Sequence, residues 1–137
     1  MARNPGGFSE GQSPFGGAAR LFAIHSAFEC KCAFTGIDLT EAVSKDPAGT
    51  LLFLDANASE PGTAITASME AIHAYERGHL AIGPRYEFLA ALDRIDPEFL
   101  ERLNPIGRLT LPADPLFYPN AALLKIHREA FAEGFID

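Results

Sequence analysis

Residues 62–83, GTAITASMEAIHAYERGHLAIG, decide the fold that we expect for this chain. Residues 63–67 combine β-branched and small residues in a run that suits a short strand. Ser68 is a favourable N-cap, and apolar residues then recur at the three- and four-residue spacing of a helix. Gly78 stands where helices often end in the left-handed conformation, and residues 80–82 return as a strand. The stretch predicts a strand, a capped helix and a second strand.

The residues before this stretch supply a partner strand. Residues 50–55 form an apolar run, so we expect an antiparallel hairpin over residues 50–67 followed by a helix over residues 68–77. The helical spacing places Met69 and Ile72 on one face, which we expect to pack against the hairpin. The hairpin side chains expected to line that core are Phe53 and Ile65.

Length and composition indicate one globular domain. The chain has 137 residues, of which 47% are hydrophobic and 21% charged, and that length suffices for a hydrophobic core. Residues 1–17 are rich in Gly, Pro, Ser and Asn, so we interpret them as a flexible arm before a domain over residues 18–137. No apolar run approaches the roughly 20 residues of a membrane span, and no signal peptide is apparent, so we expect a cytoplasmic protein.

Three separated motifs carry a family resemblance. Cys-Ala-Phe-Thr-Gly at residues 32–36 forms a Cys-x-x-Thr-Gly turn, the stretch at 62–83 follows it, and Leu-x-x-His-Arg-Glu-x-Phe ends the last expected helix at residues 124–131. In this order and spacing the motifs resemble HNH endonuclease domains of the group with that turn. The resemblance covers about residues 21–135. It implies an α+β fold with an HNH-like ββα unit, made of the hairpin and helix above with flanking helices and short strands.

The residues that perform the chemistry of such nucleases are replaced in this chain. The resemblance places the general base at Leu54 or Asp55, the asparagine at Thr63 and the metal-binding helix histidine at Ile72. An isoleucine cannot ligate a metal, and losing a general base usually costs about two to four orders of magnitude in rate. We therefore expect a degenerate domain without nuclease activity, catalytic residues or bound metal, in which Thr63 still orders its loop.

A displaced active site is the alternative reading. Tyr75-Glu76 take the place of the family's Phe-Asp pair, and His73 adjoins the lost ligand position. One step along a helix rotates a side chain by about 100°, so His73 is expected to point away from Ile72. Such a site would hold a divalent cation such as Mg²⁺ and would make the protein a DNA endonuclease. Its candidate residues are Asp55, Asn57, His73, Glu76 and His79.

The remaining histidines and cysteines favour structural roles. His25 is expected at the surface or boundary of a helix over residues 18–28, and His127 as a hydrogen-bonded core residue. Cys30 and Cys32 lie two residues apart in a strand expected over residues 29–34. Two thiolates alone do not complete a four-ligand zinc site, so we interpret them as reduced structural cysteines.

The net charge of the chain indicates which kind of partner to expect. The net charge of −7 disfavours strong nucleic-acid binding, because neutralising phosphate normally requires a basic surface. A binding or regulatory module for an unknown protein, or a homodimer, is the expected function, with no membrane association. A structural protein that shares only the architecture is a third reading. Phe8 and Phe15 in the arm are aromatic anchors that could dock on a neighbouring subunit or fold back on their own domain.

Overall fold

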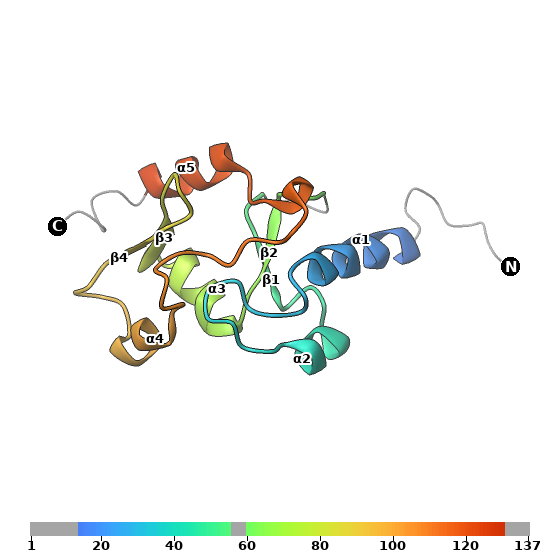
Figure 1. Cartoon of the computed structure of the whole chain (residues 1–137), viewed down its shortest axis with the longest axis horizontal. Coiled ribbons are helices and arrows are strands. Elements are labelled where there is room, and N and C mark those ends of the chain that lie inside the picture. Colours follow the sequence, from blue (N-terminus) through green and yellow to red (C-terminus); the bar gives the residue numbers. More distant parts are fainter. Residues whose placement is uncertain (1–13, 56–59, 131–137) are drawn as a thin grey trace, which may run out of the picture.

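The computed structural model describes residues 14–55 and 60–130, with side chains from residue 19 onward. This part of the chain has an α+β fold, in which helices surround two small antiparallel sheets (Figure 1). No helix in it is long and apolar enough to cross a membrane. The elements in chain order are α1 (Pro14–Ala27), α2 (Thr40–Lys45), β1 (Leu51–Phe53), β2 (Ala64–Thr66), α3 (Met69–Glu76), β3 (Leu80–Ile82), β4 (Phe88–Ala90), α4 (Pro97–Arg102), the 3₁₀ turn η1 (Pro115–Phe117) and α5 (Ala121–Ala130).

The predicted hairpin is present. β1 pairs antiparallel with β2, and two further backbone hydrogen bonds extend the pairing at its ends. The Leu54 N–H donates to the Thr63 carbonyl over 2.9 Å, and the Ala67 N–H donates to the Thr50 carbonyl over 3.0 Å. The pairing therefore joins residues 50–54 to residues 63–67, within the predicted range.

The local signals around α3 are also confirmed. The Ser68 hydroxyl accepts a hydrogen bond from the Ala71 N–H at 3.3 Å, which is the N-cap interaction expected at the first turn. Gly78 has φ of 75°, a conformation in which a Cβ atom would be strained. β3 follows directly and pairs antiparallel with β4. Local chemistry thus positions α3 between the two hairpins.

The face that α3 buries differs from the expected one. Met69 is 64% exposed and Ile72 only half-buried, whereas the fully buried helix residues are Ala71, Ala74 and Tyr75. Met69 is therefore not a core residue, and Phe53, at 37% exposure, does not lie inside the core either. The expected face and the buried face both have helical spacing, so periodicity alone does not show which of them is buried. Small alanine side chains allow the backbone of α3 to lie close to its neighbours.

The strand predicted over residues 29–34 is absent as an extended element. In residues 29–34 the φ angles of Glu29 and Cys30 are positive, at 58° and 55°, and turn the chain, so only Lys31 bridges to Asp38. Cys32 is buried while Cys30 is half-buried, which separates the two thiols. Residues 107–111 form a single bridge, between Arg108 and Glu87. Each segment is held by isolated backbone hydrogen bonds instead of a ladder.

His25 is buried completely, which corrects its predicted place at the surface or boundary of a helix. Its Nε2 lies 2.8 Å from the Pro47 carbonyl, which can only accept, so Nε2 carries the proton. Nδ1 then accepts from the Thr66 hydroxyl at 2.9 Å. The imidazole joins α1, the loop before β1, and β2. α1 itself begins at Pro14, so residues 14–17 of the expected arm belong to a helix, while Phe8 lies outside the described residues.

Candidate functional site

A groove of about 280 Å³ opens where β1, the last turn of α3 and α5 meet, and we call it the β1–α3–α5 groove. It contains two of the positions that the family resemblance singles out, Leu54 at the end of β1 and Tyr75-Glu76 on α3. Its lining residues are Leu52, Phe53, Leu54, Tyr75, Glu76, Leu123, Ile126 and His127. All but Tyr75, Glu76 and His127 are purely apolar.

An aromatic stack joins two walls of this groove. The rings of Tyr75 and His127 lie nearly parallel, at 11°, with centroids 3.5 Å apart. His127 Nε2 donates to the Tyr75 carbonyl over 2.6 Å, which ties α5 to the end of α3. Burial lowers the pKa of His127 and raises that of the Tyr75 phenol, so both side chains are neutral near pH 7. His127 is thus hydrogen-bonded, as expected, but it is half-buried and not a core residue.

The rim of the groove is apolar apart from one carboxylate. Phe53 and Ile126 are 37% and 64% exposed and extend the apolar lining to the surface. Glu76 is exposed beside them and forms no ion pair with any residue in the described ranges. The groove can therefore receive an apolar group, and its charge favours a cation next to that group.

The positions that match the family motif have structural roles here. Leu54 and Ile72 are half-buried and pack against the core. The Thr63 hydroxyl donates to the Glu60 carbonyl over 2.6 Å and orders the loop before β2, as predicted. Leucine and isoleucine side chains carry no group that could accept a proton or bind a cation. A general base or a metal ligand in this part of the fold would have to come from other residues.

The residues proposed for a displaced site fall in separate places. His73 and His79 line a second hollow, of about 190 Å³, between α3 and α4. Glu76 lines the β1–α3–α5 groove, and Asp55 follows β1. His73 is exposed where Ile72 is half-buried, which confirms that the two side chains point apart. Within the described part of the chain, no three His, Cys, Asp or Glu residues are grouped so that they could hold a metal ion. Asn57 lies outside that part.

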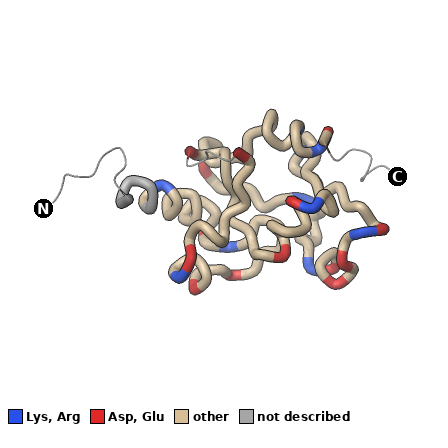
Figure 2. Tube along the Cα trace, turned by 180° about the vertical axis from the view of Figure 1, so that it is seen from behind, with Lys and Arg blue, Asp and Glu red and all other residues tan. Residues whose placement is uncertain are grey.

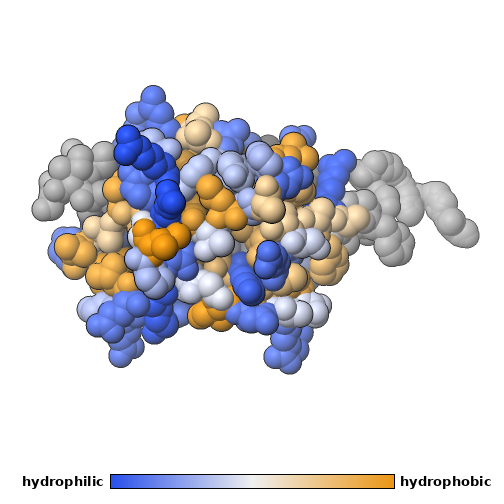
Figure 3. Space-filling view, viewed as in Figure 1, coloured by the Kyte–Doolittle hydropathy of each residue, from blue (hydrophilic) through white to orange (hydrophobic). Residues whose placement is uncertain are grey.

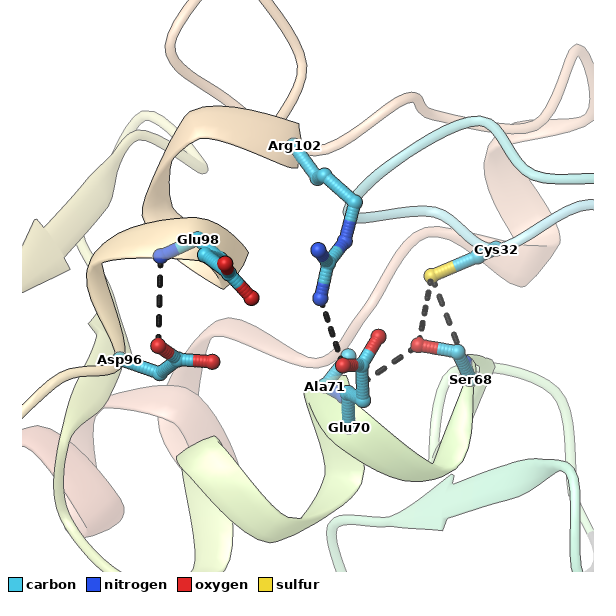
Figure 4. A network of polar contacts seen from close by, with 7 residues as sticks. All are labelled: Cys32, Ser68, Glu70, Ala71, Asp96, Glu98 and Arg102. Atoms are coloured by element: carbon cyan, nitrogen blue, oxygen red, sulfur yellow. Dashed lines mark hydrogen bonds and ion pairs between the residues drawn. The ribbon is translucent and has the colours of Figure 1, made fainter.

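Polar contacts near the second hollow hold α3 against its neighbours (Figure 4). Arg102 of α4 pairs with Glu70 of α3 at 2.5 Å. At the start of α3, the Ser68 N–H donates to the buried Cys32 sulfur over 3.3 Å. Cys32 therefore helps to anchor the helix N-terminus, a structural role as the sequence suggested.

Sequence reasoning did not anticipate the groove, because α5 contributes three of its lining residues from about 50 positions downstream. The spacing of Leu123, Ile126 and His127 on one helix was the available signal. Comparison with protein-family models, with curated proteins and with solved structures gives no match to this chain. The resemblance to HNH domains stays a prediction that rests on the motifs quoted above.

Proposed function

We propose that residues 18–137 form a degenerate HNH-like domain that does not cleave DNA and that binds a protein surface through the β1–α3–α5 groove. The order of elements supports this proposal. An antiparallel hairpin, β1–β2, leads directly into the capped helix α3, which is the order that the motif resemblance implies. The motif's substituted positions, Leu54 and Ile72, pack against the core.

The observation that carries the proposal is the apolar lining of the groove. A nuclease of this type would need a general base at the end of β1 and a metal ligand on the helix, where this chain has Leu54 and Ile72. Asp55, the other residue that could occupy the base position, is not among the lining residues. Phe53 and Ile126 instead provide exposed apolar contact area at the rim. Such a surface suits binding better than phosphate chemistry.

The charge of the groove indicates the chemistry of the partner. A phosphate approaching the groove would meet the exposed Glu76 carboxylate on a chain whose net charge is −7. Figure 2 shows Lys and Arg scattered among Asp and Glu along the part of the backbone that the structure describes, without a continuous basic stretch there. A protein segment with an apolar anchor side chain beside a Lys or Arg matches both the lining and the charge.

A cleavage assay tests the first half of the proposal. Supercoiled plasmid is incubated with excess full-length protein in Mg²⁺, Mn²⁺ or Ni²⁺ buffer, and we expect no nicking above a buffer control. Nicking that disappears in His73→Ala or Asp55→Ala would replace the proposal with a metal-dependent endonuclease that has a displaced site. Nicking unaffected by both substitutions indicates a contaminating nuclease. The assay is then repeated with protein purified free of that activity.

A peptide titration tests the second half. Two short peptides share a central isoleucine flanked by Arg in one and by Glu in the other. NMR amide shifts of ¹⁵N-labelled protein should move at Phe53, Glu76 and Ile126 with the Arg peptide and much less with the Glu peptide. Ile126→Asp should abolish the response. Equal shifts for both peptides, or shifts confined to the hollow between α3 and α4, would contradict binding at this groove.

A further inference from the structure

A rigid turn on the same chain carries a charge opposite to that of the groove. Residues 104–107 form a turn in which the Gly107 N–H donates to the Asn104 carbonyl over 2.9 Å. The Asn104 side-chain amide is buried and donates to the Ala33 carbonyl at 2.9 Å and to the Arg108 carbonyl at 3.0 Å. Ile106 stands on this turn and is 67% exposed. The hydrogen bonds fix the turn, so Ile106 is presented without a large loss of backbone entropy on contact.

Arg108 accompanies this isoleucine with a positive charge. Its side chain is exposed and forms no ion pair with any residue that the structure describes. Glu87 lies opposite Arg108 in the backbone bridge, but its carboxylate accepts from the Arg85 N–H at 2.8 Å. Ile106 and Arg108 together therefore form an apolar and cationic knob.

Other exposed apolar side chains lack this combination. Apolar groups form separate patches among hydrophilic ones on the face seen in Figure 3, so exposure alone selects none of them. Three of these exposed apolar residues are one or two positions in sequence from an acidic residue, whose carboxylate would repel Glu76: Ile37, Met69 and Leu116. Leu92 precedes Asp93 and Arg94, which pair with each other at 3.7 Å. Phe22 lies near Arg20, whose side chain already has an interaction.

We propose that the occupant of the β1–α3–α5 groove is a second copy of this chain, which inserts Ile106 between Phe53 and Ile126 and places Arg108 beside Glu76. The inference rests on the proposed function and names its partner. A groove of about 280 Å³ has room for one isoleucine side chain and part of an arginine. The paired charges, one on the knob and one at the groove, set the orientation of the contact.

The contact joins two different surfaces, so it is a head-to-tail interface. In a pair, one copy keeps its groove unused and the other keeps its knob unused, so repetition produces an open chain or a closed ring. A contact built around one side chain is small, and interfaces of that class are weak and depend on concentration. The protein should accordingly be a monomer when dilute and should associate progressively when concentrated.

Two complementary variants test this arrangement. Ile106→Asp removes the knob and keeps the groove, whereas Ile126→Asp spoils the groove and keeps the knob. Sedimentation velocity over a concentration series reaching the submillimolar range should show association of the wild-type chain, weakened about tenfold or more in either variant. An equimolar mixture of the two should form pairs and stop there, because only one productive contact remains. The matched control Leu92→Asp, at a more exposed apolar residue, should associate like wild type.

A charge exchange provides the second measurement. Arg108→Glu and Glu76→Lys should each weaken association, and the double variant should recover it. A wild-type chain that stays monomeric throughout the series would overturn the inference, as would a mixture of Ile106→Asp and Ile126→Asp that forms no pairs. Neither result affects the plasmid and peptide assays, which judge the proposed function separately. Circular dichroism of every variant confirms that these surface substitutions leave the fold intact.

Discussion

Replacing His25 by leucine is the sharpest test of the core. Leucine has a similar volume but cannot bond to Thr66 or Pro47, which the buried imidazole contacts at 2.9 and 2.8 Å, or to the Thr50 hydroxyl, which lies 3.3 Å from Nε2. The Thr50 hydroxyl also reaches the Pro47 carbonyl, at 3.2 Å, so that acceptor keeps one donor. The Thr66 hydroxyl has no other hydrogen bond within the described residues. Since one unsatisfied buried polar group costs about 1–3 kcal/mol, His25→Leu should lower the free energy of unfolding by about 1–3 kcal/mol.

The same substitution should change the pH dependence of stability. Burial lowers the pKa of His25 in the folded chain below its ordinary value of 6.5. The unfolded chain therefore takes up a proton first as the pH falls, and stability that is present above pH 6.5 is lost below it. One histidine contributes at most about 1.4 kcal/mol per pH unit in that window. The pKa of His127 is lowered in the same direction, so wild type has two such groups and His25→Leu has one.

Urea unfolding followed by circular dichroism at about pH 7.5, 6.5 and 5.5 measures both effects. The cost of His25→Leu should be largest at the highest pH and shrink toward the lowest, because acid already penalises the wild-type histidine. His73→Leu, at an exposed histidine, is the matched control and should change the free energy of unfolding little at pH 7.5. A cost below about 0.5 kcal/mol at high pH, or a pH slope identical to that of wild type, would refute the reasoning.

Five further substitutions test the helix face, the loop and the cap by the same urea unfolding. Ile72→Ala should lower the free energy of unfolding by about 1–2 kcal/mol because Ile72 is half-buried. Met69→Ala, at an exposed residue, should lower it by less than about 0.5 kcal/mol. A larger loss for Met69→Ala than for Ile72→Ala would contradict the observed buried face of α3. Gly62→Ala should cost about 1–3 kcal/mol, since φ is +87° and the new Cβ would lie 3.1 Å from the Tyr118 carbonyl oxygen; a stabilised variant would count against this geometry. Ser68→Ala should cost about 1 kcal/mol by removing the N-cap, whereas Ser68→Asp should retain most of the stability.

The sequence by itself determined the elements whose signals are local. Ser68 and Gly78 bound α3 because a side-chain acceptor and a positive φ are properties of single residues. Asp96 and Asn120 cap α4 and α5 for the same reason. The hairpin at residues 50–67 followed from two short apolar runs joined by a loop. For the candidate site, the motif singled out Leu54 and the Tyr75-Glu76 pair as positions but did not predict that they lie together.

Tertiary structure decided the features that depend on which distant parts of the chain pack against a residue. Alanines and larger apolar residues both recur at helical spacing on α3, and the packing of the rest of the chain buries the alanine face. Residues 29–34 have strand-like composition, yet the chain turns at Glu29 and Cys30, so no ladder forms. His25 is a buried link because Thr66, Pro47 and Thr50, all distant in sequence, supply its polar contacts. The groove exists because α5 packs its His127 ring on Tyr75, a contact 52 residues apart that no local pattern encodes.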